Sequence, residues 1–364
     1  MSEQKHELWL NSIKGLSIIK KTKLCEKAHG ATNLYHTSEK ELRSYGFLKD
    51  AEVDAIIKAK ESLDPDYLYY ELHEKDISFV SIEDENYPER LKNIYEKPYG
   101  LYYTGALPKK SRRMTALIGA RRCSAYGSSE AFEIAYILSK AGIGIISGMA
   151  RGIDSASHRG CLEADGYTCA VLGSGIDVCY PPENKELYEL IKNKGCIISE
   201  FPPGSQPVAK HFPLRNRIIS GLSDSVIVVE AREKSGSLIT AELALQQNRD
   251  VYAVPGRIND PMSYGTNKLI ECGAGIIVST SRLLENITKD SDMPKIELDL
   301  EKKLPSLSQE EQMIYDLIDY YSTSAETLLT ESGLEYGQLL QILFSLSEAG
   351  LIKKTGQLNY VKAY

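Results

Sequence analysis

The chain has 364 residues and a formal net charge of −7, with 42% hydrophobic and 26% charged residues. This length is enough for two or three domains, each with a buried core. No stretch approaches the length of a membrane span and the first residues lack the apolar run of a signal peptide, so we expect a cytoplasmic protein. The seven cysteines form no CxxC pair, and several lie in apolar runs. They predict reduced core thiols, without disulfides or a metal site.

The first predicted domain, residues 1–76, is helical. Its apolar pattern alternates helices with turns at Gly15, Gly30 and Gly46, and it resembles a helix-hairpin-helix or SAM-like module. The turn amides of such modules often contact a DNA backbone. The turn KGLSI lacks the second glycine that is typical of the tight hairpin. We therefore favour a packing or interaction unit and keep DNA contact as the alternative.

The second predicted domain, residues 80–290, alternates short apolar strands with amphipathic helices. The strand segments are TALIG, GIIS, TCAVLG, CIIS, SVIVVE, VYAVPG and AGIIVS. Their order predicts an α/β fold with a Rossmann-like, doubly wound, mainly parallel sheet. The domain has neither the GxGxxG fingerprint nor the GxxxxGK[ST] phosphate loop. We therefore expect no cofactor and no ATPase activity.

A predicted linker, residues 291–306, precedes a predicted C-terminal domain at 307–364. Three helices and a hairpin with its turn at Thr355 and Gly356 predict a winged helix. A winged helix that binds DNA carries cations on its third helix, and EYGQLLQILFSLSEAG has none. Residues 297–364 contain eleven carboxylates against five lysines, which is nearly the whole net charge of the chain. We expect this domain to contact protein or to self-associate.

The segment GSQPVAKHFPLRNRIISG at 204–221 combines cations, an aromatic ring and amides. No Asp or Glu occurs between Glu200 and Asp224. A helix is expected to open after Pro213, and its first N–H groups add a positive dipole end. Cations would hold phosphates and the phenylalanine would stack on a base. The residues predicted to bind a nucleic-acid strand are Lys210, Phe212, Arg215, Asn216 and Arg217. The alternative is a surface loop with a core phenylalanine and solvated arginines.

A second stretch without carboxylates, residues 97–129, contains seven cations. Its middle, TALIGARR, is an apolar strand that ends in a glycine turn. In an open parallel α/β sheet the binding crevice lies at the carboxyl ends of the strands. We therefore expect Gly119 and Arg121 to meet a phosphate.

The segment SGMARGIDSASHRG at 147–160 contains several polar candidates. Arg151 is expected to reach a phosphate, whereas Asp154 and Ser155 are expected to cap the next helix. His158 lies four residues after Asp154, which suggests an acid and imidazole pair. We interpret it as a packed helix histidine, because no Ser or Cys nucleophile is placed with it.

The turn KSGSLITAE resembles a phosphate-binding turn. Gly236 permits close backbone approach, and Ser235 or Ser237 can cap the following helix. Together with the preceding Lys234, these residues form the last candidate contact for a nucleic-acid strand.

Residues 80–290 resemble the DNA processing protein A family, DprA or Smf. The motifs that carry the resemblance are the GAR turn, SGMARGIDSASHRGCL, AVLGSGIDVCYPPEN, SEFPPG, HFPLRNRIISGLSDSVIVVEA, KSGSLITAELAL and VYAVPG followed by GTNKLI. The resemblance implies a protein that binds and protects single-stranded DNA and loads RecA recombinase onto it during natural transformation. It further implies a protein that is not an enzyme and that forms a homodimer through the Rossmann-like domain.

The family's strand-binding pocket falls on the GAR turn with Arg121, on the loop from Lys210 to Arg217, and on the turn from Lys234 to Ser237. The family often places its loop lysine three residues before the phenylalanine. This chain has Ala209 there and Lys210 one residue later, so the role of the lysine is less firmly implied than that of Arg121.

Two other functions stay open at this point. The domain also resembles nucleoside monophosphate phosphoribohydrolases, whose PGGxGTxxE motif compares with KSGSLITAE. Glu242 keeps the acid near the right spacing, but Ser235 and Gly236 replace the paired glycines, which suits a polymer backbone better than a buried nucleotide. The third possibility is a protein adaptor in which the acidic winged helix dominates.

Overall fold

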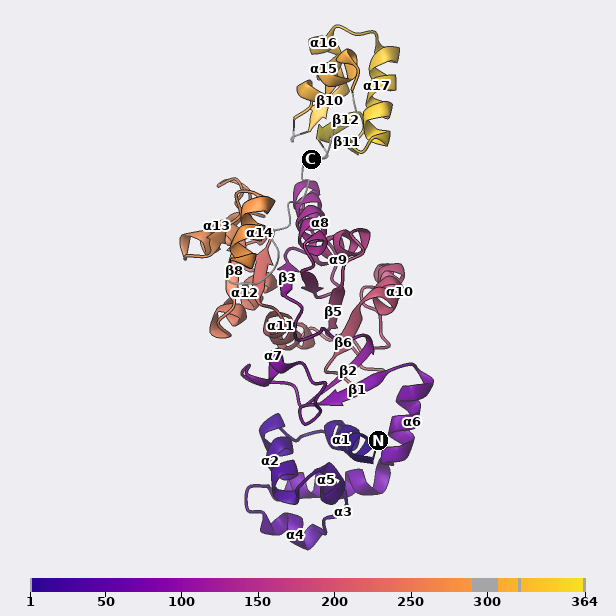
Figure 1. Ribbon diagram of the computed structural model, residues 1–364, viewed down its shortest axis with the longest axis vertical. Helices are drawn as coiled ribbons and strands as arrows, with labels where there is room; N and C mark the ends of the chain where they lie inside the picture. The colour runs from indigo at the N-terminus through magenta and orange to yellow at the C-terminus, as the bar shows by residue number, and fades with distance from the viewer. Residues whose placement is uncertain (1, 290–306, 320–321, 363–364) are drawn as a thin grey trace. The chain divides into compact units, whose positions relative to one another are not determined.

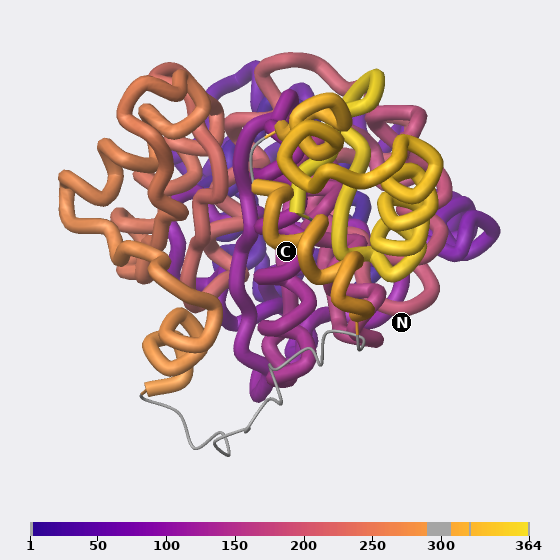
Figure 2. The backbone as a smooth tube through the Cα atoms, turned by 90° about the horizontal axis from the view of Figure 1, so that it is seen from above, coloured from indigo at the N-terminus to yellow at the C-terminus, as the bar shows by residue number. Residues whose placement is uncertain are grey.

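The computed structural model describes residues 2–289, 307–319 and 322–362. The predicted linker, 291–306, lies outside the described residues. The chain divides into two compact units, Met1–Arg122 with Ala131–Ser291 and Cys123–Glu130 with Asp292–Tyr364. Figure 1 and Figure 2 show the backbone in two perpendicular views. The domain boundaries expected from the sequence remain predictions. Over the described ranges, no helix has the length and apolar character needed to cross a membrane, and no cluster of three or more metal-binding side chains occurs.

Helices open the first unit, as the N-terminal pattern predicts. They are α1 (Ser2–Ser12), α2 (Ile18–Ala28), α3 (Ala31–His36), α4 (Glu39–Ser44), α5 (Asp50–Ser62) and α6 (Pro65–Glu74). Trp9 of α1 is fully buried among their apolar side chains and donates its indole N–H to the Ala59 carbonyl at 3.2 Å. Ser17 caps α2 by accepting from the Lys20 N–H. These helices therefore share one core.

The sheet of the first unit has nine strands in the order β1-β2-β6-β5-β4-β3-β7-β8-β9. They are β1 (Ser78–Ser81), β2 (Gly100–Gly105), β3 (Met114–Ile118), β4 (Gly144–Ser147), β5 (Thr168–Leu172), β6 (Cys196–Ser199), β7 (Ser225–Val228), β8 (Asp250–Ala253) and β9 (Gly275–Ile276). The seven strands from β3 to β9 pair in parallel. At one edge, β2 pairs antiparallel with β6 and β1 pairs antiparallel with β2. The prediction of a Rossmann-like, doubly wound, mainly parallel sheet is confirmed.

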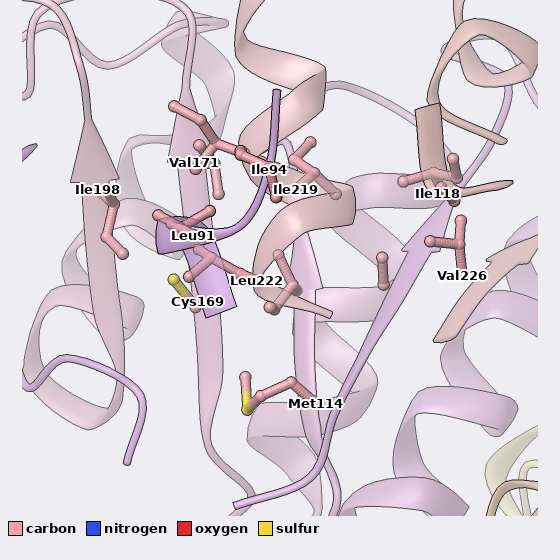
Figure 3. Close-up of a cluster of buried hydrophobic side chains, with 14 of the residues drawn as sticks. Leu91, Ile94, Met114, Ile118, Cys169, Val171, Ile198, Ile219, Leu222 and Val226 are labelled. Carbon is pink, nitrogen blue, oxygen red and sulfur yellow. The ribbon is translucent and has the colours of Figure 1, made fainter. Parts of the chain in front are cut away.

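Helices alternate with these strands: α7 (Glu89–Lys92), α8 (Ala125–Lys140), α9 (Ile153–Glu163), α10 (Lys185–Lys194), α11 (His211–Leu222), α12 (Gly236–Gln246), α13 (Tyr264–Glu271) and α14 (Thr280–Thr288). Successive residues of β5 point to opposite faces of the sheet. Cys169 and Val171 join a buried cluster with side chains of α7, α11 and α12, part of which is drawn in Figure 3. Ala170 and Leu172 join a second cluster that includes side chains of α10. Because both faces are covered, the central strands are continuous apolar runs in the sequence.

The second unit contains α15 (Gln309–Leu317), β10 (Thr323–Ser324), α16 (Ala325–Ser332), α17 (Tyr336–Glu348), β11 (Ile352–Gly356) and β12 (Asn359–Lys362). Its strands form an antiparallel sheet in the order β10-β12-β11. This is the winged-helix arrangement that the sequence predicts. The expected hairpin turn is two residues out of place, because Thr355 and Gly356 still belong to β11 and Leu358 takes the left-handed conformation with φ 59°.

Candidate nucleic-acid interface

A groove of about 760 Å³ opens at the carboxyl ends of β3 and β7. These neighbouring strands form the point where the strand order reverses, since β4, β5 and β6 lie beyond β3 and β8 and β9 beyond β7. Ligands of open α/β sheets bind at such a switch point. We call this feature the strand groove. Its walls come from the turn after β3, the first turns of α11, and the turn between β7 and α12.

Gly119 begins the turn after β3. A Cβ atom there would lie 2.6 Å from the Ile153 Cγ1 and 3.0 Å from the Glu230 carbonyl oxygen. Only glycine fits this close backbone approach. The glycine therefore lets the chain turn at the strand end and present Arg121 and Arg122, both exposed, along the groove.

The guanidinium of Arg121 lies over the ring of Phe212, with its central carbon 4.9 Å from the ring centroid. The ring of Tyr180 lies 5.7 Å from that of Phe212, tilted by 42°. Phe212 also packs closely on the backbone at Gly173, where a Cβ atom would lie 2.9 Å from its Cδ1. The ring is half-buried. The Arg121 guanidinium therefore covers one face of the Phe212 ring.

The start of α11 differs from the expectation. The helix opens at His211, before Pro213, so Phe212 lies in its first turn. The ring of His211 stacks on that of Phe201 at a centroid distance of 4.0 Å. This contact fixes the loop that enters the helix. Phe212 is thus held by helical backbone as well as by its side-chain neighbours.

Arg215 is buried, whereas the sequence predicts that it binds a phosphate. Its Nη1 donates to the carbonyl oxygens of Gly148, at 2.8 Å, and Val171. Burial lowers the pKa of the guanidinium to about 10, while the nearby Asp154 carboxylate opposes this shift. Arg215 therefore ties α11 to the ends of β4 and β5, and its cation lies beneath the groove.

Arg217 also has a partner inside the fold. It donates from Nη2 to both carboxylate oxygens of Glu200, at 2.7 and 2.8 Å. Its side chain is only 11% exposed. Glu200 borders the stretch without carboxylates on its N-terminal side, and in the structure its carboxylate contacts Arg217 of α11. Arg217 is absent from the groove lining, so we assign it to packing.

Asn216 and Lys210 flank the groove without strong internal bonds. Asn216 lines it and donates from Nδ2 to the Gly236 carbonyl at 3.4 Å, which connects α11 to the turn before α12. Lys210 is exposed just before α11, next to the lining residue Ala209. Lys210 itself is absent from the groove lining.

The turn before α12 forms the opposite wall. Ser235 caps α12, and its hydroxyl accepts from the Ser237 N–H. Lys234 and Gly236 are exposed and line the groove, and a Cβ atom at Gly236 would meet nothing within 4 Å. The first amides of α12 and the Lys234 cation consequently face one opening, as an anion site requires.

The turn after β4 departs from the expected capping pattern. Asp154 lies inside the first turn of α9 and is buried, where it accepts from the N–H groups of Gly148 and Ala150 at 3.1 and 3.2 Å. Ser155 donates to the Ala150 carbonyl at 2.6 Å instead of capping the helix. Burial raises the pKa of the Asp154 carboxyl, and the Arg215 cation opposes that shift. Asp154 therefore stabilises the loop beneath the groove through these two backbone N–H groups.

Arg151 and His158 take separate roles. Arg151 is exposed, forms an ion pair with Glu183, and is absent from the groove lining. His158 is fully buried with Nδ1 2.7 Å from the Thr168 hydroxyl oxygen. Burial lowers the pKa of His158 to about 3, with a further contribution from the Arg215 cation. The interpretation of a packed helix histidine is confirmed.

The model of the DNA recombination-mediator protein A family matches residues 78–288, which is more than half of the chain. The chain belongs to this family. It is 44% identical over 204 residues to DNA processing protein DprA of Streptococcus pneumoniae, covering 56% of this chain and 72% of that protein. It is 36% identical over 290 residues to protein Smf of Synechocystis, covering 79% of this chain and 73% of that protein.

Solved structures of the family share the fold. The X-ray structure of DNA processing protein A from Streptococcus pneumoniae superposes with a TM-score of 0.69 at 35% identity, covering 78% of this chain and 98% of that one. A structure that describes the single-stranded DNA binding mode of DNA processing protein A from Helicobacter pylori has a TM-score of 0.54 at 31% identity. It covers 59% of this chain and 96% of that one.

In this family member, the groove lining also includes residues that the sequence motifs do not single out as ligands. They are Arg122, Tyr180, Arg232 and Ile239. Arg122 and Arg232 are exposed, and Tyr180 and Ile239 are 42% and 43% exposed. Arg122 adjoins Arg121 in the GARR run, so its sequence position was a usable signal. Arg232 and Ile239 lie close to Lys234 in the sequence, in the segment between β7 and the first turn of α12. Only Tyr180 is brought beside Phe212 by the fold alone.

Proposed function

We propose that the protein binds single-stranded DNA in the strand groove. The observation that carries this proposal is the charge of the lining. Its ionisable side chains comprise several cations and one carboxylate, Asp154, whose charge is already directed to backbone N–H groups and faced by Arg215. The exposed cations are Arg121, Arg122, Arg232 and Lys234, while the buried Arg215 lies beneath them. Such a lining attracts a phosphate backbone in a chain whose net charge is negative.

The aromatic side chains favour a single strand over a duplex. Phe212 and Tyr180 line the same groove as the cations, with Arg121 over the phenylalanine. Unpaired bases can stack on these planes while their phosphates meet the walls. A duplex hides its base faces, so it would use the cations alone. The relative from Helicobacter pylori, which binds single-stranded DNA, supports the same use of the fold.

Family membership leads to the wider role. We propose that the protein protects incoming strands in the cytoplasm and loads RecA recombinase onto them during natural transformation, without acting as an enzyme. We also propose a homodimer through the Rossmann-like sheet. The exposed apolar side chains Ile276, at 48%, and Val278, at 59%, lie in and just after its edge strand β9. Sedimentation at several concentrations tests the dimer. Recombinase filament formation on strands already coated with a single-strand-binding protein tests loading.

The alternative of a nucleotide-cleaving enzyme has weaker support. Glu242, the acid that this alternative requires, is exposed on α12 and is absent from the groove lining. A carboxylate that polarises a bound ribose must face the pocket that holds it. The geometry therefore favours polymer binding over cleavage of a buried nucleotide.

The decisive experiment compares three ligands at several salt concentrations. Fluorescence anisotropy would follow labelled oligo-dT and a blunt duplex of equal length, and chromatography would follow base release from AMP. We expect tighter binding of oligo-dT, with an affinity that falls steeply as salt rises. Equal or tighter binding of the duplex would reject the proposal. Base release from AMP that Glu242→Gln abolishes would favour the enzyme.

A further inference from the structure

The three helices of the second unit contain no lysine or arginine. They hold six carboxylates, at Glu310, Glu311, Asp316, Glu326, Glu331 and Glu348. The lysines in the described part of this unit, Lys353, Lys354 and Lys362, lie on β11 and β12. The helices are thus acidic and the wing is basic, with Lys362 of β12 lying over the ring of Tyr315 in α15 at 4.9 Å. A DNA-reading winged helix has the opposite charge on its third helix.

Helix α17 exposes a row of large apolar side chains. Tyr336, Leu340 and Phe344 are 48%, 37% and 69% exposed. They follow one another at intervals of four residues, so they form one ridge along the helix. Glu348 continues the same spacing at the end of α17. The ridge lies apart from the core-facing residues of the helix, which are Leu339, Ile342, Leu343 and Leu346.

We propose that this ridge of α17 docks a basic amphipathic helix of a partner protein. An i, i+4 ridge packs into the groove between side-chain rows of a second helix. The apolar face of the partner would cover Leu340 and Phe344. Lysines or arginines beside that face would meet Glu348 and Glu311, whose carboxylate accepts from the Ser345 hydroxyl of α17 at 2.6 Å. This is helix recognition by apolar anchors with complementary charge around them.

The charge pattern also selects against a second copy of the same surface. Two α17 ridges in contact would bring two sets of acidic helices together, and these helices themselves carry no lysine or arginine to neutralise the other copy. Like charges across an interface oppose association. A nucleic acid is disfavoured for the same reason.

The full-length protein can be tested with a labelled synthetic peptide of about 18 residues, long enough to form a helix. Leucines at every third and fourth position form one face, and lysines occupy the rest. A peptide with the same composition in scrambled order controls for charge alone. Anisotropy should show tight binding of the amphipathic peptide and at least roughly tenfold weaker binding of the scrambled one. Equal binding of the two peptides would overturn the proposal.

Variants locate the site. Phe344→Ala should weaken peptide binding by roughly tenfold or more, and Glu348→Gln by roughly threefold with a shallower dependence on salt. Tyr95→Ala is the matched control, since Tyr95 is an aromatic residue of the first unit with 86% exposure. Deleting residues 307–364 should abolish peptide binding and leave oligo-dT binding intact. Unchanged peptide binding in Phe344→Ala would contradict the proposal, as would a dimer in sedimentation that this variant dissociates.

Discussion

The guanidinium of Arg121 lies 4.9 Å above the ring centroid of Phe212 and forms one side of the strand groove. The two residues come from separate stretches, the turn after β3 and the first turn of α11. Arginine side chains bind the phosphates of single-stranded DNA through their charge, and aromatic rings stack on its bases. The contact between Arg121 and Phe212 makes them one unit, so substitutions of the two should show coupled effects on strand binding.

Replacing Arg121 should separate its charge from its planar shape. Arg121→Ala is expected to weaken oligo-dT binding by about 1 to 3 kcal/mol and to reduce the salt dependence of the affinity, because a charge-assisted phosphate contact is lost. Arg121→Lys should keep the salt dependence and lose the stacking plane, giving an intermediate affinity. Anisotropy at several salt concentrations measures both. Arg159→Ala, an exposed arginine outside the groove, should leave the affinity unchanged. An unaltered salt dependence in Arg121→Ala would assign Arg121 to structure.

Phe212→Ala should affect both binding and stability. We expect a loss of roughly 1 to 3 kcal/mol in strand binding, because a stacking surface is removed. We also expect unfolding to become easier by about 1 to 3 kcal/mol, less than for a fully buried ring, because Phe212 still packs on Gly173 and Tyr180. Urea unfolding and oligo-dT binding of the same preparation separate the two effects. Reduced stability with unchanged affinity in the folded protein would eliminate the stacking role.

Arg215→Met should act chiefly on stability. The substitution removes the donor to the Gly148 and Val171 carbonyls and leaves the buried Asp154 carboxylate without its neighbouring cation. We expect a loss of about 3 to 5 kcal/mol in the free energy of unfolding, because a buried charge is left without a nearby opposite charge. Chemical denaturation measures it. Wild-type stability with lost strand affinity would instead identify Arg215 as a phosphate ligand.

Acid should destabilise the fold through His158. The pKa of His158 is about 3 in the folded protein, against an ordinary value of 6.5. Between these pH values the unfolded chain binds the extra proton, so stability falls as the pH falls through this window. From pH 7 to pH 5, His158 should lower the free energy of unfolding by about 2 kcal/mol.

Urea unfolding at pH 7, 6 and 5 tests this contribution. The decrease in stability should be smaller for His158→Gln than for the wild type. His29→Gln, which replaces an exposed histidine, should retain the wild-type decrease. Identical pH dependence in all three proteins would refute the assignment to His158.

The central strands could be predicted from the sequence because each is a short apolar run followed by a helical pattern. Strands β3 to β9 therefore coincide with the predicted segments. The cap by Ser235 and the turn at Gly119 were similarly visible, since both depend on local backbone chemistry. The edge strands β1 and β2 were not predicted, because they pair antiparallel outside the repeating strand and helix pattern.

The sequence alone thus determined the strand and helix order, the acidic character of the C-terminal helices and the position of Arg121 after a strand. Only the tertiary structure decided which cations face the groove. Arg215 and Arg217 belong to the same run as Phe212, yet one is buried on the Gly148 and Val171 carbonyls and the other pairs with Glu200. Linear spacing cannot show this, because the face that each residue of α11 presents depends on how the helix packs against the sheet and on which polar groups that packing brings within hydrogen-bonding distance.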